Sequence, residues 1–159
     1  MNQGFDWEAP IEPGRAMFGL PLGLPHDAIK KLIGCDGEIL QKTTGLRNSP
    51  KILIDCRQSG VIYFRAADMG AVEYDWQNIL ARLVFKQDML ESIVVESVAG
   101  GAEYAYKGKL LSKVGLGEKV AELLEIVETE FDDAEEIFYS DKLKGFEVAG
   151  DDSCNLSVN

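Results

Sequence analysis

The sequence predicts an α+β fold for this chain of 159 residues. Two kinds of apolar pattern support the prediction. Short runs rich in β-branched residues, such as KILIDC at 51–56 and VIYFRA at 61–66, are typical of strands. Longer stretches with apolar residues three and four positions apart, such as the one that follows Pro25, are typical of helices. Apolar residues make up 46% of the chain, which is enough for a folded core.

The net charge of −11 is distributed unevenly along the chain. The first fourteen residues carry acidic residues and no basic ones, and residues 15–87 are mildly basic. Residues 88–159 carry seventeen Asp and Glu against six Lys. Such asymmetry indicates separate roles for parts of a chain. The sequence therefore predicts a flexible N-terminal arm at 1–15, a folded module at 16–86, an acidic hairpin-plus-helix extension at 87–150 and a tail at 151–159.

Targeting and cysteine patterns bound the class of protein. No basic start leads into an apolar run, and no apolar stretch reaches the length of a membrane span. The three cysteines are scattered and form no CxxC pair, so neither a disulfide framework nor a zinc site is expected. The sequence therefore predicts an intracellular protein, cytoplasmic or nuclear, with reduced thiols, no membrane contact, no metal and no other cofactor.

The first half of the module begins with a strand and a helix. AMFGLPLGL at 16–24 is typical of a strand that Pro21 restricts to the edge of a sheet. Pro25 then opens a helix, since proline fits the first turn of a helix. The apolar face of this helix is expected to comprise Ala28, Ile29, Leu32 and Ile33. Gly34 is expected to end it.

The second half of the module contains two more helices and a hairpin. A short helix is expected to restart at Ile39 and Leu40 and to end at Gly45. The strands at 51–56 and 61–66 are expected to form a hairpin. Asp68 is then expected to cap a long helix. Its apolar positions would be Val72, Trp76, Ile79, Leu80, Leu83 and Val84.

The segment LIGCDGEILQKTTG at 32–45, followed by KILID and VIYF, resembles the K-homology (KH) domain of the type with its extra helix at the C-terminal end. The resemblance covers residues 16–86. It implies a three-stranded antiparallel sheet packed on three helices, followed here by the acidic α+β extension. It also implies a groove for about four unpaired nucleotides, with the GxxG loop on the nucleic-acid backbone.

The residue types around the loop fit that expectation. Gly34 and Gly37 have no Cβ, so a phosphate–sugar backbone could approach them closely. Apolar residues would form the floor of the groove, and basic residues would line its rim. The expected RNA-binding residues are Lys30, Lys31, Ile33, Gly34, Cys35, Asp36, Gly37, Ile39, Leu40, Lys42, Arg47, Lys51, Ile52, Ile54 and Arg57.

Asp36 departs from the family, which usually places a basic residue at the centre of this loop. A carboxylate about 4 Å from a phosphate opposes binding by about 1 kcal/mol in water and about 4 kcal/mol at a surface-like dielectric. The alternative role of Asp36 is to cap the helix that follows.

A helix with a long apolar seam is expected at 117–139 in the acidic extension. Apolar residues recur there at heptad spacing, and the other face is acidic. The seam could be part of the core or an oligomerisation surface. The acidic pairs lack the ligand spacing of a calcium loop, so they are expected to be solvated.

The expected function is non-catalytic binding of single-stranded RNA through the GxxG groove, weak or regulated because of Asp36. The alternative is a protein-interaction scaffold that keeps the KH shape, has lost RNA binding and uses the acidic helix at 117–139 as its binding surface. A thiol enzyme at Cys35 is a third class, but His26 is the only histidine and is expected at the surface. The sequence therefore predicts a protein that is not an enzyme.

Overall fold

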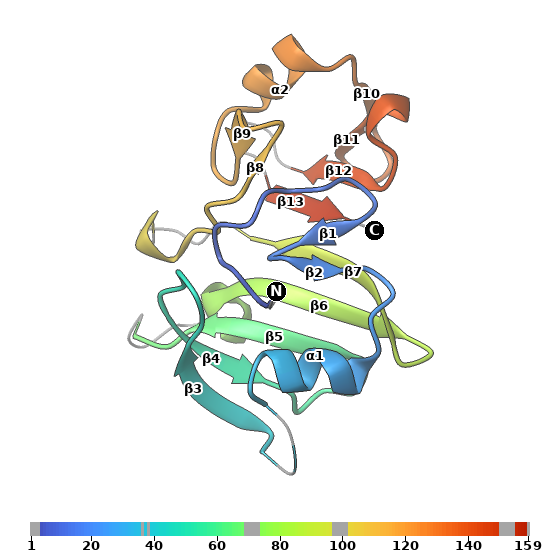
Figure 1. Ribbon diagram of the computed structural model, residues 1–159. Coiled ribbons are helices and arrows are strands. Elements are labelled where there is room, and N and C mark those ends of the chain that lie inside the picture. Colours follow the sequence, from blue (N-terminus) through green and yellow to red (C-terminus); the bar gives the residue numbers. More distant parts are fainter. Residues whose placement is uncertain are drawn as a thin grey trace.

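The structure is a computed structural model that describes residues 4–35, 37, 39–68, 74–96, 102–149 and 155–158. It contains mostly strands, with two short α-helices (Figure 1). The strands are β1 (Ala16–Met17), β2 (Leu20–Pro21), β3 (Gln41–Gly45), β4 (Lys51–Asp55), β5 (Val61–Ala66), β6 (Ile79–Lys86), β7 (Met89–Val95), β8 (Lys109–Leu110), β9 (Val114–Gly115), β10 (Glu130–Asp132), β11 (Ile137–Tyr139), β12 (Phe146–Ala149) and β13 (Asn155–Val158). The helices are α1 (His26–Leu32) and α2 (Val120–Ile126), with 3₁₀-helices η1 (Asp75–Asn78), η2 (Ala102–Tyr104) and η3 (Asp141–Leu143).

A nine-stranded antiparallel sheet is the main feature of the fold. Its strand order is β10-β11-β12-β13-β7-β6-β5-β4-β3, while β1–β2 and β8–β9 form two separate hairpins. The last strand in the chain, β13, lies in the interior of the sheet between β7 and β12. It therefore joins the strands of the first half of the chain to those of the second half.

The predicted KH-like fold is wrong, because the residues that the structure describes form a nine-stranded sheet and two short α-helices, not a three-stranded sheet packed on three helices. The segment after the GCDG turn forms strand β3, which pairs with β4 over five register positions. The β-branched Thr43 and Thr44 favour this extended form. A helix over so few residues would gain little from its own hydrogen bonds.

The long helix expected from Asp68 is wrong over the described residues of that stretch, since residues 75–78 form η1 and the residues from Ile79 form strand β6. Ala81, Leu83 and Phe85 are buried, whereas Arg82 and Val84 between them are half-buried, which is a period of two. Pairing with both β5 and β7 stabilises this alternation. Val72, another expected position of that helix, lies outside the described residues.

The expected helix at 117–139 is limited to α2. Residues beyond it form β10 and β11, and Phe131 and Phe138 of the predicted seam are cross-strand partners with ring centroids 4.8 Å apart. The Asp132 carboxylate accepts hydrogen bonds from the backbone N–H groups of Ala134 and Glu135, so the acidic stretch is a turn. The acidic residues expected on one helix at 117–139 are therefore divided between α2, β10 and the β10–β11 turn, so they do not form a helical binding surface.

The expected arm at 1–15 is packed against the core from residue 4 onward. Phe5, Trp7 and Ile11 are buried, and the Trp7 indole N–H donates to the Ala105 carbonyl at 3.0 Å. Ile11 also forms a bridge with Leu110 of β8. This segment lies between the two hairpins and contacts both halves of the chain.

The two halves repeat the same order of elements, namely a hairpin, a seven-residue helix and antiparallel strands. Gly23 and Gly117 both have positive φ and stand at the same distance before α1 and α2. Ile29 and Leu123 occupy the same position in the two helices, and each is fully or almost fully buried. The boundary expected at residue 86 falls in the tight β6–β7 hairpin, where Lys86 pairs with Met89.

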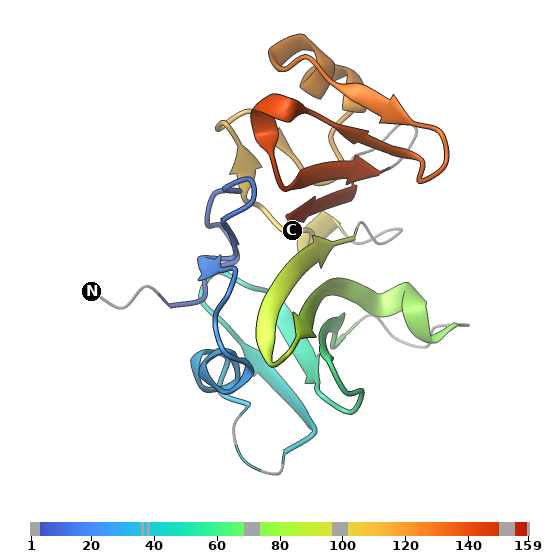
Figure 2. The same cartoon turned by 90° about the vertical axis from the view of Figure 1, so that its right-hand side faces the viewer.

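One hydrophobic core lies on a single face of the sheet and extends through both halves. A row of register partners on this face is buried throughout: Ile62, Leu83, Ile93, Val158 and Phe146. Helix α1 and the N-terminal segment lie on this side of the sheet (Figure 2). Within the described residues, neither helix is long and apolar enough to cross a bilayer.

Candidate functional site

The other face of the sheet, here called the open face, carries polar and aromatic side chains. A second row of register partners crosses all nine strands on this face, since directly paired residues of antiparallel strands project to the same side. The side chains of this row are Gln41, Asp55, Tyr63, Arg82, Val94, Glu147, Tyr139 and Glu130, and the row passes through β13 at the backbone pairing of position 157 with Val94 and Glu147. Among the described elements, both α-helices and both small hairpins belong to the core side.

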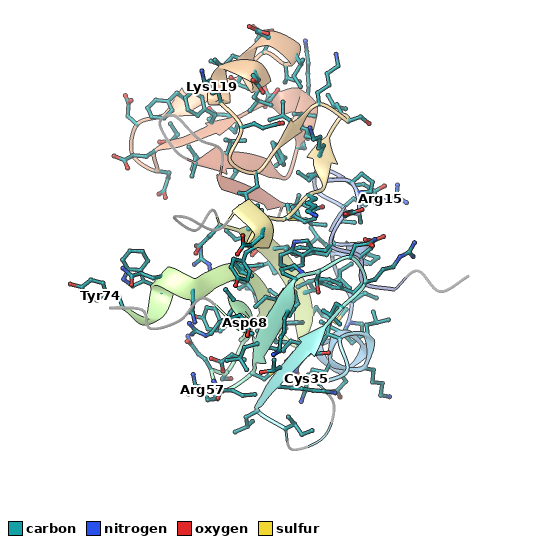
Figure 3. All side chains as sticks on the ribbon, turned by 90° about the vertical axis from the view of Figure 1, so that its left-hand side faces the viewer. Arg15, Cys35, Arg57, Asp68, Tyr74 and Lys119 are labelled. Carbon is teal, nitrogen blue, oxygen red and sulfur yellow. The ribbon has the colours of Figure 1, made fainter. Side chains whose placement is uncertain are left out.

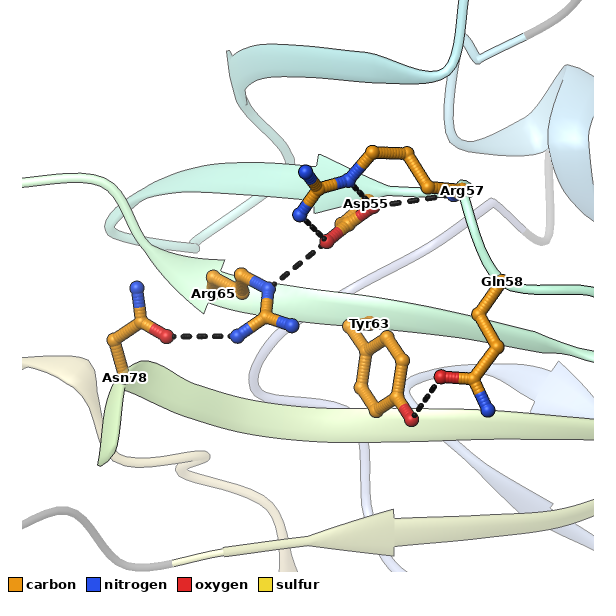
Figure 4. Close-up of polar contacts among 6 residues, drawn as sticks. All are labelled: Asp55, Arg57, Gln58, Tyr63, Arg65 and Asn78. Atoms are coloured by element: carbon orange, nitrogen blue, oxygen red, sulfur yellow. Dashed lines mark hydrogen bonds and ion pairs between the residues drawn. The ribbon is translucent and has the colours of Figure 1, made fainter. Parts of the chain in front are cut away.

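Asp55 is the centre of an ion-pair network on the open face (Figure 4). It ends β4 and is only 2% exposed. The Arg57 guanidinium binds its two carboxylate oxygens with Nε–Oδ1 and Nη2–Oδ2 distances of 2.9 and 2.8 Å. Arg65 Nε donates to Oδ2 at 3.1 Å, and Arg65 Nη1 donates to Asn78 at 2.9 Å. The carboxylate thus connects β4 with β5, and through Arg65 it is linked to Asn78 at the end of η1.

Local geometry explains why these residues meet. Side chains two residues apart on an extended segment project to the same side, which places Arg57 beside Asp55. The pKa of Asp55 is held far below its ordinary value, first by the hydrogen bond from the Arg57 side chain and then by those from the Arg57 backbone and from Arg65, against the effect of burial. The network is therefore ionised at neutral pH.

The arginines of the open face are held in defined orientations. The Arg65 guanidinium lies 5.1 Å from the centre of the Tyr63 ring, a distance typical of a cation–π contact. Tyr63 donates its hydroxyl hydrogen to Gln58 at 3.1 Å. On the next strand, Arg82 binds Glu96 at 2.8 Å. The β4–β6 part of the open face is thus a fixed array of arginine and tyrosine side chains.

Two exposed aromatic residues project beside this array. Tyr74 and Trp76 stack with ring centroids 6.0 Å apart and an interplanar angle of 7°. Tyr74 is 52% exposed and Trp76 is 64% exposed. Figures 2 and 3 show η1 and Tyr74 on the side of the sheet opposite α1. The Gln77 side chain accepts a hydrogen bond from the Tyr74 N–H, which fixes the start of η1.

The far end of the open face is acidic. Glu130 and Asp132 of β10 and Glu147 of β12 project there. Tyr139 donates its hydroxyl hydrogen to Glu130 at 2.7 Å, and this hydrogen bond is the main cause of the raised pKa of Tyr139. The open face therefore changes in charge along its length, from paired arginines at β4–β6 to carboxylates at β10–β12.

The apolar floor of the expected RNA groove is not accessible. Ile33, Cys35, Ile52 and Ile54 are all 0–1% exposed and belong to the core. Ile39 and Leu40 are exposed. They do not belong to an open groove, because Ile52 and Ile54 of the expected floor are buried in the core. Asp36 lies outside the described residues.

The glycine at the start of the expected loop ends α1. Gly34 has φ of 70°, and its N–H binds the Lys31 carbonyl, while the Cys35 N–H binds the Lys30 carbonyl at 2.8 Å. This pair of hydrogen bonds is the Schellman motif, which requires a left-handed residue after the helix. Gly37 also has a positive φ of 78°.

We expect Gly34→Ala to lower the free energy of unfolding by about 1 kcal/mol, because alanine is strained at positive φ. An added Cβ would meet only the Lys42 Nζ at 3.6 Å, so no steric clash contributes. Gly45→Ala is the matched control, since Gly45 has ordinary backbone angles and open space around it. Urea denaturation measures both. Equal stability of the two variants would contradict the assignment of Gly34 as the helix-ending residue.

The expected basic rim is divided between different surfaces. Arg47 binds Asp6 at 3.4 Å, Lys51 binds Asp68 at 3.6 Å, and Arg57 belongs to the Asp55 network. Lys42 donates to the Gly34 carbonyl at 2.9 Å. The remaining two expected rim residues, Lys30 and Lys31, lie in the last turn of α1 on the core side. The structure therefore does not bring these side chains together as one phosphate-binding rim.

The open-face residues that the sequence analysis missed are Tyr63, Arg65, Arg82 and Tyr74, and Trp76 was assigned to a helix face. The alternation of Ile62, Tyr63, Phe64 and Arg65 was a usable signal, since it gives a strand one apolar and one polar-aromatic face.

Within the described residues, no group of three or more His, Cys, Asp and Glu side chains is arranged to hold a metal ion. No protein-family model, curated protein or solved structure matches the chain. The geometry of the open face is therefore the main feature that bears on what this chain binds.

Proposed function

We propose that this chain is a protein-interaction module that binds a protein partner through the β4–β6 part of the open face, with Trp76 and Tyr74 as the main contact residues. The exposed Tyr74–Trp76 stack is the observation that carries the proposal. An indole exposed to this extent has its apolar surface in water, and burying that surface in a partner is favourable.

The composition of the site supports a protein partner. Trp, Tyr and Arg are the residues most enriched among those that dominate binding energy at protein interfaces. Here Trp76 and Tyr74 lie at η1, where Asn78 accepts a hydrogen bond from the buried Arg65. Tyr63 and the half-exposed Arg57 are held by the same Asp55 network. Ordered side chains lose less conformational entropy when they bind, so a fixed array favours affinity.

Charge favours a protein over RNA as the partner. Each arginine of the site has a carboxylate partner, namely Asp55 or Glu96, and the far end of the open face is acidic. RNA affinity depends mainly on cations available to phosphates. The aromatic stack alone would suit unpaired bases, so single-stranded RNA is an outcome that the experiment must distinguish.

We expect Trp76→Ala to weaken partner binding by about tenfold to thirtyfold or more, the usual effect of removing a central aromatic contact. Its free energy of unfolding should change by less than about 0.5 kcal/mol, because Trp76 is exposed. Leu124→Ala is the matched control, since Leu124 is a similarly exposed apolar residue of α2 on the core side.

The measurement uses the immobilised full chain and its two variants to capture proteins from an extract, with quantitative mass spectrometry and then affinity measurement on the captured protein. A protein retained by the wild type and by Leu124→Ala but lost with Trp76→Ala supports the proposal. Proteins retained equally by all three chains contradict it. Stronger binding of fluorescent single-stranded RNA than of any protein, lost with Trp76→Ala, would assign the face to RNA.

A further inference from the structure

Two of the three cysteines lie together on the core side of the sheet. Cys35 follows the end of α1, and Cys56 follows the end of β4. Their Sγ atoms are 3.4 Å apart, and neither cysteine is in a disulfide. Cys35 is fully buried, whereas Cys56 is partly accessible. A disulfide has an S–S distance of about 2.05 Å, so a movement of about 1.4 Å would join them.

The surrounding contacts direct the two thiols toward each other. The Cys35 N–H is fixed by the Schellman motif of α1, and the Cys56 N–H donates to the Leu40 carbonyl at 2.7 Å. Neighbouring strand residues project to opposite faces, so Cys56 points toward α1 while Asp55 points to the open face. Both backbones are therefore held by hydrogen bonds on the side of the sheet away from the proposed binding surface.

We propose that Cys35 and Cys56 are a dithiol site that a low-molecular-weight disulfide, such as oxidised glutathione, converts reversibly to a disulfide. The accessible Cys56 thiol loses its proton, and its sulfur attacks one sulfur of the oxidant and releases one glutathione thiol. Cys35 then loses its proton and attacks the Cys56 sulfur of this mixed disulfide, which releases the second glutathione. Two S–H bonds are replaced by one S–S bond, and the oxidant takes up the two electrons and two protons.

The environment sets how fast this reaction runs. Burial and the hydrogen bond with Cys35 raise the pKa of Cys56 to about 12. The thiolate is the attacking species, so it is scarce at neutral pH. The rate of closure is therefore expected to rise about tenfold for each pH unit between about pH 7 and 9. Such a slow dithiol would respond to sustained oxidising conditions rather than to a brief pulse.

Closure is also expected to stabilise the fold. The bond would connect the end of α1 to the end of β4 and would close the chain between residues 35 and 56. A loop of this length restricts the unfolded chain, which should raise the Tm by roughly 5–10 °C. The Asp55 network and the Tyr74–Trp76 stack lie on the other face, so partner binding should not change.

The experiment uses the full chain and its Cys154→Ser variant, in which Cys35 and Cys56 are the two remaining cysteines. Each protein is incubated with oxidised glutathione at several pH values, and its intact mass and Tm are measured before and after reduction with dithiothreitol. The expected result is the loss of two hydrogen atoms, a higher Tm and full reversal. Mass mapping of a proteolytic digest identifies the pair.

Several outcomes would overturn the proposal. These are an unchanged mass at every pH, a glutathione adduct that never closes, and closure that leaves the Tm unchanged or lower. Cys56→Ser, at a partly exposed position, is the control and should show no closure. The mass of the wild-type chain does not depend on a variant that folds, so it decides the result even if Cys154→Ser or Cys56→Ser is unstable.

Discussion

A chain that ends at residue 154 is expected to lose the cooperative folding of its C-terminal strands, at a cost of more than about 4 kcal/mol in the free energy of unfolding. Strand β13 is paired with β12 at four register positions and with β7 at three. Removing it leaves one edge of each neighbour without hydrogen-bond partners in the interior of the sheet. It also removes Val158, which is fully buried in the common core.

Hydrogen exchange followed by mass spectrometry measures this effect strand by strand. Amides of β10, β11 and β12 should lose most of their protection, whereas those of β4 and β5 should keep more of theirs. A chain that ends at residue 158 is the matched control and should behave as the full chain does. Full protection of β12 in the shorter chain would mean that β13 does not join the two halves of the sheet.

Asp55→Ala is expected to lower the free energy of unfolding by about 3 kcal/mol, because it leaves the buried Arg65 guanidinium without its carboxylate partner. Asp55→Asn should cost less, since an amide oxygen can still accept a hydrogen bond. Glu91→Ala is the control, because its ion pair with Lys86 is exposed and such pairs contribute about 0–1 kcal/mol. Urea denaturation followed by tryptophan fluorescence measures all three, and equal effects of Asp55→Ala and Glu91→Ala would contradict the network.

The pH dependence of stability provides a second readout of the same network. In the folded protein, the Arg57 side chain above all lowers the pKa of Asp55 below its ordinary value of 3.8. The ionised form of Asp55 therefore stabilises the fold. This stabilisation is complete above the pKa of the unfolded chain, and it is lost as the pH falls through the pKa of the folded state. The stability difference between wild type and Asp55→Asn should therefore be constant from about pH 6 to 8 and shrink below about pH 4.

The elements that local sequence determines were predicted from the sequence. The helix after Pro25 with Ile29 inside, its end at Gly34 and the strands at 51–56 and 61–66 are confirmed as α1, β4 and β5. Pro25 and Gly34 mark the start and end of the helix, and alternating apolar residues mark the two strands, so each pattern fits only one type of element. The overall fold was not predicted, because the apolar spacings of β6 and β10–β11 fit a helix as well as a strand, and Ile39 and Leu40 before β3 suggested the start of a helix.

The open face could be predicted only in part, because pairing over long sequence distances creates it. The alternation in β5 places Tyr63 and Arg65 on one face, and this much is visible in the sequence. Nothing local indicates that β13 inserts between β7 and β12, which makes one sheet of the two halves. The GxxG motif was misleading because a glycine that ends a helix and a glycine that admits a phosphate have the same sequence signature.

Site-specific photo-cross-linking tests the proposed binding face most directly. A benzophenone amino acid replaces Tyr74 in the full chain, and in a control chain it replaces Leu124, which is also exposed. Irradiation in an extract should join position 74 to one discrete protein, and this product should disappear when Trp76→Ala is added. No discrete protein product at position 74, or the same products at both positions, would contradict protein binding through the β4–β6 part of the open face.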